Sequence, residues 1–564
     1  MARVGTSTVR ESVEALRGRP SADVLVIGGG INGLAVLRDL ALQGVDVALV
    51  EADDYASGAS GASSHMIHGG IRYLENGEFR LVRESVQERN RLLRTAPHLV
   101  SPLRTVVPIS SFWSGLFAAP LRMLTHRQGR PSERGALLIK IGLTVYDVFS
   151  RGNGLVPRHR FAGRRRTRAE FPAFHDRIRY SARYFDAAVP DPERLCIDLL
   201  HDALGAGARS ANQTRAIGFG DAGVMLRDEQ SGETFPFAAK VVLNASGPWT
   251  DLTNSALGMP SHHMGGTKGS HIVLDDPELL RAANGSEIFF ENSDGRVVLI
   301  YPIRGRVMVG TTDLDADPTE PAVCTEEEID YFADLVAMVF PGLPVRRDRI
   351  VYRFAGIRPL PRHDDLAHGF VSRDYRLVEE QHGSSVVMSL VGGKLTTFRA
   401  LAENLSTAIM RRLGGSRTAD TRELPIGGGR GFPTEPDARA AWVGARSGDL
   451  GADRVDRLLG RYGTRCAAYL AAVGSERPLE TLPDYSAEEI AWLVRTEQVV
   501  HLTDVLQRRT SLALEGRLTA ECLGELAAVV GGALGWTDAE REREIERAAA
   551  HFRELHGVAH LVEA

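Results

Sequence analysis

A run of glycines near the N-terminus has the spacing of a phosphate-binding turn. Gly28, Gly30 and Gly33 lie in the segment GGGING, between a short apolar run and apolar residues at helical spacing. In such a turn the first glycine permits the bend, the second lets the backbone approach a pyrophosphate, and the third lets helix and strand pack closely. The N–H groups and the dipole at the start of the helix favour negative charge. Glu51, about twenty residues downstream, would accept hydrogen bonds from an adenosine ribose.

The elements that must position this turn are a strand, a helix and a second strand. Residues 23–27 and 45–50 are the apolar runs, and the helical face between them consists of Leu34, Leu37, Leu40 and Ala41. Because all parts of the pattern agree, we interpret 23–51 as the βαβ unit of a dinucleotide fold rather than as a structural glycine turn. The unit alone does not separate FAD from NAD.

Residues 57–74, SGASGASSHMIHGGIRYL, are small and hydroxyl-bearing residues followed by a His-Gly-Gly motif, a composition that lets a chain wrap around a bulky cofactor. Here the sequence resembles the FAD-dependent glycerol-3-phosphate dehydrogenases. In that family a serine-rich stretch leading into a His-Gly-Gly-hydrophobic-Arg-Tyr-Leu motif lines the flavin and the substrate. The resemblance implies FAD as the cofactor. One difference changes the chemistry: His65 stands where a lysine is common in the family.

Later motifs extend the resemblance, in family order, to about residue 413. A predicted buried strand, 240–243, runs into the motif NASGPW at 244–249. A second predicted strand, 386–390, precedes the motif GGKLTT at 392–397 and then a helix, whose N-terminus would stabilise the negative charge of reduced flavin. The resemblance implies that FAD is bound by Gly28, Gly30, Asn32, Gly33, Glu51, Ser60, Ser63, Ser64, His68, Gly69, Gly70, Ala245, Gly247, Trp249, Gly356, Gly393, Lys394, Leu395 and Thr396.

Oxidation of a secondary alcohol needs a hydride acceptor, a base for the hydroxyl proton and groups that orient the substrate. For the base we favour His271, in the segment Lys-Gly-Ser-His, because an imidazole titrates near neutral pH. A core histidine satisfied by backbone is the plainer alternative. Lys394 is the rival base if burial beside arginines lowers its pKa.

A phosphate on the substrate calls for planar cations that form two hydrogen bonds at once. The family motifs select Arg358, Arg373 and Arg72, with the hydroxyl of Tyr73, as the substrate-binding residues. Arg358, which we count as catalytic together with His271 and Lys394, is expected in a constrained turn. No metal site is predicted, because the histidine pairs 65/68 and 262/263 lack a third ligand at suitable spacing.

Composition bounds the class of protein. The 564 residues carry a net charge of −5, which argues against nucleic acid as the main partner. Four cysteines lie far apart with no CxxC spacing, which fits a reducing compartment. Residues 1–20 have no apolar signal region, and no run approaches the roughly 18 apolar residues of a membrane span. We therefore expect a cytoplasmic protein.

Two apolar segments between Ser111 and Phe149 have two interpretations. They are either core helices or an interfacial surface, with Trp113 and Phe117 in lipid and nearby basic residues at the headgroups. The segment from Arg158 to Arg168 holds six arginines and is expected to be a solvated loop or a phospholipid contact. The second interpretation predicts peripheral association with the cytoplasmic membrane.

The predicted fold class is α/β, a Rossmann-like FAD-binding domain with an inserted antiparallel β substrate domain and a C-terminal helical domain. Strands at 271–274, 297–303 and 307–309 follow one another without helices, which predicts the antiparallel sheet. The segment GGGRGFPTEP is interpreted as a linker to the helical domain. The predicted boundaries are 21–95, 186–255 and 351–426 for the FAD-binding domain, 96–185 and 256–350 for the substrate domain, and 427–564 for the helical domain.

The function that the resemblance implies is oxidation of sn-glycerol 3-phosphate to dihydroxyacetone phosphate, with electrons passed from FAD to a quinone and a homodimer as a candidate assembly. One alternative keeps the flavin fold but uses oxygen as acceptor, or oxidises amino or 2-hydroxy acids. Another, of a different class, is a non-catalytic redox-sensing flavoprotein subunit that docks through its C-terminal helices.

Overall fold

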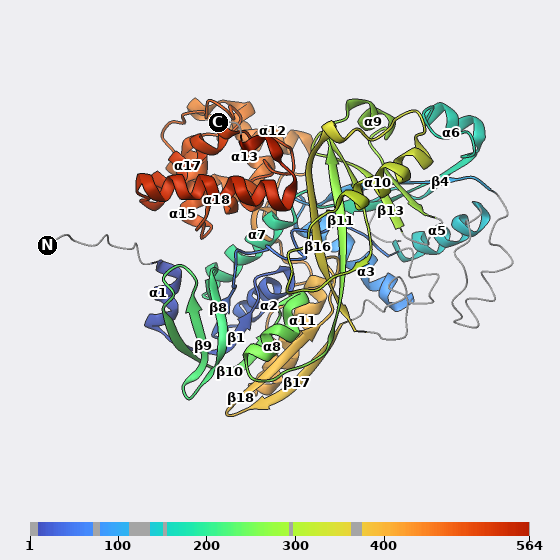
Figure 1. The fold of residues 1–564 in the computed structure, drawn as a ribbon. Helices are drawn as coiled ribbons and strands as arrows, with labels where there is room; N and C mark the ends of the chain where they lie inside the picture. The colour runs from blue at the N-terminus through green and yellow to red at the C-terminus, as the bar shows by residue number, and fades with distance from the viewer. Residues whose placement is uncertain are drawn as a thin grey trace.

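The computed structural model describes residues 10–70, 79–111, 136–150, 155–292, 297–362 and 375–562. Three parts are visible in Figure 1: a sheet at the bottom, a second sheet at the upper right and the C-terminal helices at the upper left. Two long strands, β11 (Met264–Leu274) and β16 (Ile350–Pro361), run between the upper and lower parts. The predicted α/β class is confirmed.

The first sheet has the strand order β17-β18-β10-β1-β2-β7. Its strands are β1 (Ser21–Ile27), β2 (Val47–Val50), β7 (Arg209–Ala211), β10 (Thr234–Asn244), β17 (Arg376–His382) and β18 (Ser385–Val391). All neighbours are parallel except β17 and β18. Both faces are covered, which explains why the strands are continuous apolar runs.

The two faces of β1 pack against different elements. Val24 and Val26 face a core made with α2 (Ile31–Leu42), α7 (Pro192–Gly205) and α11 (Phe398–Arg412). Leu25 and Ile27 face the opposite core, made with α1 (Glu11–Gly18) and the hairpin of β8 (Thr214–Gly220) and β9 (Gly223–Asp228). The βαβ unit of the glycine turn is as predicted. Helix α1 was not predicted from the sequence.

The second sheet has the order β15-β11-β14-β13-β12-β4-β6-β3, with β16 on β11 and β5 on β6. Its other strands are β3 (Met66–Ile67), β4 (Ser101–Ile109), β5 (Arg160–Ala162), β6 (Tyr180–Ala188), β12 (Glu287–Glu291), β13 (Val297–Ile303), β14 (Arg306–Gly310) and β15 (Leu314–Asp315). Pairing is antiparallel except between β12 and β4. The predicted antiparallel sheet, including the hairpin of β13 and β14, is confirmed.

Helices cover this second sheet. On one face lies α10 (Glu326–Val339), which begins at a capping box formed by Thr325 and Glu328. Elsewhere α3 (Phe79–Thr95) packs with α5 (Ala136–Ser150). The shorter helices of this part are α6 (Arg164–Glu170) and α9 (Pro277–Ala282), whereas α8 (Thr250–Ala256) lies against β8, β10 and β18 of the first sheet.

Two local expectations were wrong. The arginine-rich segment is not simply a loop, because β5 and α6 form there, although most of its arginines are exposed. The segment Gly427–Gly429 is not a simple linker either. It forms a 3-10 helix in which Gly428 and Gly429 are buried, and a side chain at Gly428 would lie 2.1 Å from the carbonyl oxygen of Tyr462.

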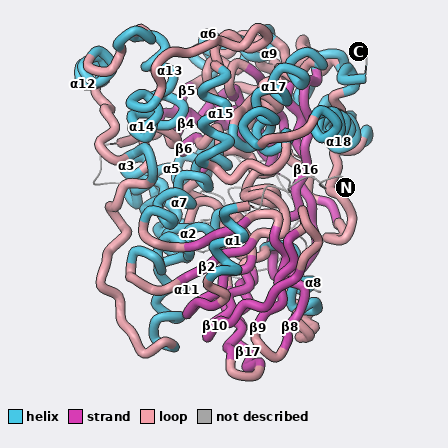
Figure 2. The backbone as a smooth tube through the Cα atoms, turned by 90° about the vertical axis from the view of Figure 1, so that its left-hand side faces the viewer, coloured by secondary structure: helices cyan, strands magenta, loops and turns pink. Residues whose placement is uncertain are grey.

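The C-terminal unit is helical, as predicted. Its helices are α12 (Pro436–Gly444), α13 (Ala452–Tyr462), α14 (Cys466–Ala472), α15 (Ala487–Thr496), α16 (Leu502–Asp504), α17 (Ala520–Leu534) and α18 (Asp538–His556). Its core includes residues of the second sheet. Tyr352 and Phe354 of β16 and Met308 of β14 belong to the same buried cluster as Leu526 and Phe552. Figure 2 shows these helices above the first sheet, with β16 reaching between the two regions.

We predict that the shared core makes unfolding cooperative. Phe552→Ala removes a fully buried ring and should lower the free energy of unfolding by about 3–5 kcal/mol. Denaturant unfolding, followed by far-UV circular dichroism and by tryptophan fluorescence, should show one transition shifted in both signals. Two separate transitions, with only one of them shifted, would mean that the helical unit folds independently.

Candidate active site

The first glycine turn is fixed by close backbone approaches. Gly28 has a φ of +113°, and a side chain there would lie 2.6 Å from the carbonyl oxygen of Ala245. A side chain at Gly33 would lie 1.9 Å from the carbonyl oxygen of Gly28. At Gly30 the nearest atom would be the hydroxyl of Ser60, at 3.2 Å. Gly30 also lines the cavity described below, so a ligand can approach its backbone there.

The helix that follows presents its N-terminus to this space. No acidic side chain lies in the first turn of α2, and the Ile31 N–H donates to Ser60 Oγ at 2.9 Å. Glu51, at the end of β2, accepts from the N–H groups of Gly29 at 2.5 Å and Asp53 at 2.9 Å. Burial raises the pKa of the Glu51 carboxyl to about 7.

A cavity of about 1040 Å³ lies over the turn. Nine of the residues predicted to bind FAD line it: Gly28, Gly30, Asn32, Glu51, Ser60, Ala245, Gly247, Trp249 and Gly356. Its size is at the upper end of the range for small-molecule pockets. A glycine at the cavity wall, a helix N-terminus without acidic side chains and an acid at the next strand end suit a pyrophosphate and a ribose, so the residues present fit FAD.

The remaining predicted cofactor residues lie in segments that contact one another. Thr396 donates to the carbonyl oxygen of His68 at 3.3 Å, and Gly393, with a φ of +114°, approaches the side chain of Asn32. The structure therefore brings the GGKLTT turn, which also holds Lys394 and Leu395, against both the His-Gly-Gly motif and the first glycine turn. Ser63 makes a local contact, accepting from the His65 N–H at 3.2 Å.

The His-Gly-Gly motif is held from the second sheet. The Gly69 N–H donates to Asp186 Oδ1 at 2.8 Å, and Arg89 donates to the same oxygen at 3.2 Å. Gly70 has a φ of +77°. These buried contacts fix the backbone of the motif without using its own side chains.

His271 lies on β11 and is buried. Its Nε2 is 2.9 Å from Ser64 Oγ, and its ring stacks on Phe354 with centroids 4.7 Å apart. Burial holds the pKa of the imidazole well below its usual value, so the ring is neutral at neutral pH. Within the described residues its Nδ1 has no hydrogen-bond partner. The ring is thus not satisfied by backbone in that part of the chain.

Arg358 does not lie in a turn, and that expectation was wrong. It is an interior residue of β16 opposite Thr267 of β11, so the sheet, and not Gly356 and Pro359, fixes its backbone. Its guanidinium pairs with Asp313 at 2.9 Å and donates to Thr311 Oγ1 at 3.0 Å. The side chain is 19% exposed.

His271 and Arg358 are related by the pairing of β11 with β16. Phe354 lies opposite His271, and Arg358 is four residues further along the same strand. Residues an even number apart project from the same face, so the imidazole and the guanidinium share one face. The Arg358 guanidinium reaches back over Gly269, two residues from His271, so the two groups are closer together than their backbones. That arrangement suits a small substrate with a hydroxyl near one end and an anionic group at the other.

Three predicted substrate-binding residues, Arg72, Tyr73 and Arg373, lie outside the described residues. In the part of the chain that the structure describes, no group of three or more His, Cys, Asp or Glu side chains could hold a metal ion.

One wall of the cavity was not predicted from the sequence. The C-terminal unit contributes lining residues that include Arg461, Tyr485, Arg508, Leu514 and His551. The available signal was the segment 501–514, which resembles the family and contains Arg508. The partners of Arg358, Thr311 and Asp313, were also missed.

We predict that FAD affinity depends on pH through Glu51. A ribose hydroxyl needs the ionised carboxylate as acceptor, and the pKa of Glu51 is about 7 without ligand. FAD affinity should therefore fall below pH 7, by up to about tenfold per pH unit, and stay level above it. Titration of apoprotein by flavin fluorescence measures this. Glu51→Gln should bind more weakly with a flat profile, and an unchanged profile in Glu51→Gln would contradict the assignment.

Comparison with protein families places the chain. Residues 23–399 match the family model described as FAD dependent oxidoreductase, and residues 419–541 match the C-terminal domain of alpha-glycerophosphate oxidase. A glycerol-3-phosphate dehydrogenase from Synechocystis sp. is 32% identical over 552 residues, covering 93% of this chain and 95% of the relative. D-erythritol 1-phosphate dehydrogenase from Brucella abortus is 32% identical over 506 residues, covering 87% and 94%.

Among solved structures, a glycerol-3-phosphate dehydrogenase from Bacillus halodurans complexed with FAD has the same fold. It has a TM-score of 0.73 at 23% identity, with 96% of each chain covered. The family matches span the cofactor cavity and the helical unit together. The chain belongs to the family of FAD-dependent glycerol-3-phosphate dehydrogenases.

Proposed function

We propose that the protein oxidises sn-glycerol 3-phosphate to dihydroxyacetone phosphate. The observation that carries the proposal is the placement of His271 and Arg358 on one face of the β11 and β16 pair, with His271 bonded to Ser64 and Arg358 two residues beyond Gly356, both predicted to bind FAD. FAD, when bound, would supply the hydride acceptor for the alcohol carbon. Two relatives, named for glycerol 3-phosphate and D-erythritol 1-phosphate, support a phosphorylated polyol as the substrate class.

In this proposal His271 takes the hydroxyl proton. A base must be unprotonated before it acts, and burial keeps this imidazole neutral. Ser64 and the stacked ring of Phe354 hold its orientation. Arg358 orients the phosphate, with Thr311 and Asp313 fixing the guanidinium, and Arg72, Tyr73 and Arg373 complete the substrate contacts. Lys394, in the turn before α11, contacts flavin or substrate.

We further propose that electrons pass to a quinone at a membrane surface. In the described chain no helix has the length and apolar composition to span a membrane. Ile141 and Val148 of α5 are 52% and 47% exposed, seven residues apart and therefore on one side of the helix, whereas Leu143 and Tyr146 are buried. A helix with this pattern can lie in a lipid interface.

Basic residues lie beside this apolar stripe. Asp147 of α5 accepts from the His159 ring at 2.8 Å, which brings the exposed residues Arg158 and Arg160 next to the helix. Figure 1 shows α5 at the edge of the molecule farthest from the C-terminal helices. Apolar insertion and attraction of the arginines to anionic headgroups would act together. A homodimer stays a candidate assembly.

We predict that Arg358→Lys is not conservative. An ammonium cannot replace two parallel hydrogen bonds to a phosphate, so kcat/KM for glycerol 3-phosphate should fall about 30- to 1000-fold. Unphosphorylated glycerol, which lacks the contact, should lose far less. The measurement is kcat/KM for both substrates, with flavin content checked, and with D-erythritol 1-phosphate as a third substrate to define the preferred chain length.

Arg353→Lys is the matched control, because Arg353 lies on the same strand, projects to the opposite face by strand alternation and pairs with Glu326. It should leave both substrates nearly unchanged. An equal proportional loss on glycerol and glycerol 3-phosphate in Arg358→Lys would mean that Arg358 serves the flavin or the fold. If no candidate alcohol bleaches the bound flavin without oxygen, a non-catalytic subunit is the better assignment.

We predict flotation with anionic vesicles that weakens with salt but does not vanish. Ile141→Asp with Val148→Asp should abolish it while leaving the oxidation of substrate by a soluble dye intact. Arg543→Glu, on α18, is the charge control and should still float. Failure of the wild type to float would assign this face to the protein core or to a protein contact. If oxygen reoxidised the reduced flavin faster than a quinone analogue did, the proposal of a quinone as electron acceptor would be contradicted.

A further inference from the structure

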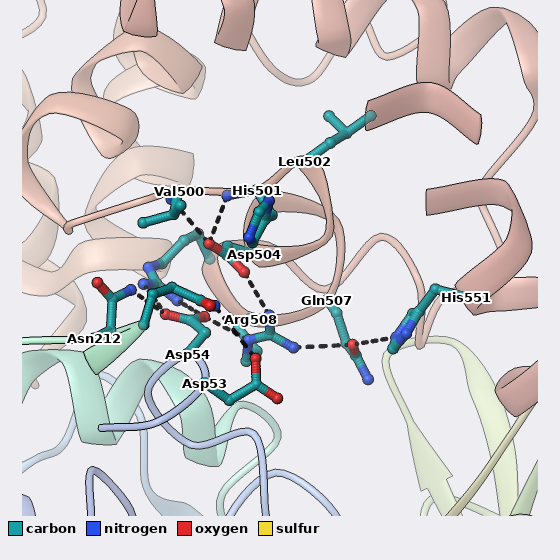
Figure 3. A network of polar contacts seen from close by, with 12 residues as sticks. Asp53, Asp54, Asn212, Val500, His501, Leu502, Asp504, Gln507, Arg508 and His551 are labelled. Carbon is teal, nitrogen blue, oxygen red and sulfur yellow. Dashed lines mark hydrogen bonds and ion pairs between the residues drawn. The ribbon is translucent and has the colours of Figure 1, made fainter. Parts of the chain in front are cut away.

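The loop after Glu51 is gripped by the C-terminal unit. Asp54, three residues beyond Glu51, is fully buried. Arg509 donates to its two carboxylate oxygens at 2.7 and 2.8 Å, Arg508 donates from Nε, and Asn212 donates at 2.9 Å. Figure 3 shows Asp54 beneath the C-terminal helices with Arg508 directed toward it. We infer that the C-terminal unit is part of the cofactor site. In this inference Arg508 and Arg509 act through Asp54 to position residues 52–56, which we call the adenosine loop.

Local geometry lets two consecutive arginines reach one carboxylate. Residues Val505–Arg509 form a π-helical turn, which is wider than an α-helical turn and is common at functional positions. In a regular helix neighbouring side chains diverge by about 100°. Here both guanidinium groups meet at Asp54. They hold the pKa of its carboxyl well below the usual range, so Asp54 is charged.

The arginines are themselves anchored within the C-terminal unit. Arg509 donates to the carbonyl oxygen of Glu497 at 2.9 Å, and Arg508 donates to Asp504 at 2.6 Å. Asp504 accepts from the His501 N–H at 2.9 Å, and the His501 ring contacts Glu544 of α18 at 2.9 Å. The two arginines that bind Asp54 are therefore themselves fixed by hydrogen bonds to the rest of the helical unit.

At its other end the loop forms part of the cradle. The Ala56 N–H donates to the carbonyl oxygen of Gly29 at 3.1 Å, and the Tyr55 ring packs over Gly29, 2.7 Å from where a side chain would begin. Gly29 in turn donates to Glu51. A shift of Asp54 would therefore move both the acid that receives the ribose and the turn that receives the pyrophosphate.

The same region borders the cavity directly. Asp53 and Arg508 both line it, as does Glu193, whose carboxyl lies beside Gly61 of the serine-rich segment. The helical unit thus closes one wall of the cofactor cavity and fixes the loop behind it. This combination makes Asp54, Arg508 and Arg509 positioning residues for FAD rather than a remote interface pair.

The test compares FAD binding in full-length variants. Asp54→Asn and Arg509→Gln should each weaken FAD affinity by about 10- to 100-fold, because one member of a buried charged pair loses its partner. The double variant should be no weaker than the worse single one, since both changes remove one interaction. The measurements are the dissociation constant of FAD by fluorescence titration of apoprotein, the rate of FAD release from holoenzyme, and the Tm of apoprotein.

Arg465→Gln is the matched control. Arg465 also joins the C-terminal unit to the part that contains the first sheet, through an ion pair of 2.9 Å with buried Asp198 of α7. It does not contact the adenosine loop. It should lower the apoprotein Tm while leaving FAD affinity within about twofold. If Arg465→Gln and Asp54→Asn both lost FAD affinity in proportion to their decreases in apoprotein Tm, the inference would be overturned.

Two further variants keep the test decisive. Arg508→Lys, which retains the charge, serves as the test if Asp54→Asn fails to fold, and its FAD affinity should lie between those of the wild type and Arg509→Gln. Wild-type FAD affinity in both Arg508→Lys and Arg509→Gln would overturn the inference. Gly30→Val places a branched side chain where the pyrophosphate is predicted. Full FAD binding in a folded Gly30→Val protein would show that the cradle itself is wrongly placed, an outcome that also removes the basis for the positioning role.

Discussion

The pairing of β11 with β16 is the interaction on which the site depends. This antiparallel pair carries His271 on one strand and Arg358 on the other, so its register sets the distance between the proposed base and the proposed phosphate contact. The register is enforced by contacts that tolerate no side chain: at Gly269 one would lie 2.0 Å from Arg358, and at Gly310 one would lie 2.1 Å from His271. A slip of one residue between the two strands would place His271 and Arg358 on opposite faces of the sheet.

The same strand pair joins the parts of the molecule. Gly356 of β16 packs against Ala62 of the serine-rich segment, and a side chain there would lie 2.4 Å from the Ala62 methyl group. Two and four residues earlier, Phe354 and Tyr352 enter the core of the C-terminal helices. One strand therefore meets the cofactor segment, the proposed base and the helical unit. Loss of the helical core would be felt at the site because no flexible linker separates them.

Arginine is the chain's usual cation, and the structure uses it inside the protein. Arg89 with Asp186, Arg194 with Glu497, Arg399 with Glu88 and Arg509 with Asp54 are buried pairs. Each guanidinium is held by several acceptors, as burial of a charge requires. Two of these pairs hold segments of the predicted flavin site, Asp186 the His-Gly-Gly motif and Asp54 the adenosine loop. Their value is in placement, since buried ion pairs add little net stability.

The sequence by itself determined what depends on neighbours along the chain: the glycine turn and its βαβ unit, the antiparallel strands, the FAD family and the residue types of the site. It placed Arg358 in a turn because Gly356 and Pro359 are locally turn formers, whereas the pairing with β11 imposes a strand. From the sequence, Gly427–Gly429 was interpreted as a linker, and no cofactor or substrate residue was predicted beyond it. The reason is that the contacts of Arg508 and Arg509 with Asp54 span more than 450 residues. Such contacts leave no periodicity or spacing in a single sequence. Only the tertiary structure decided that the helical unit shares the core of the substrate sheet and forms a wall of the cofactor cavity.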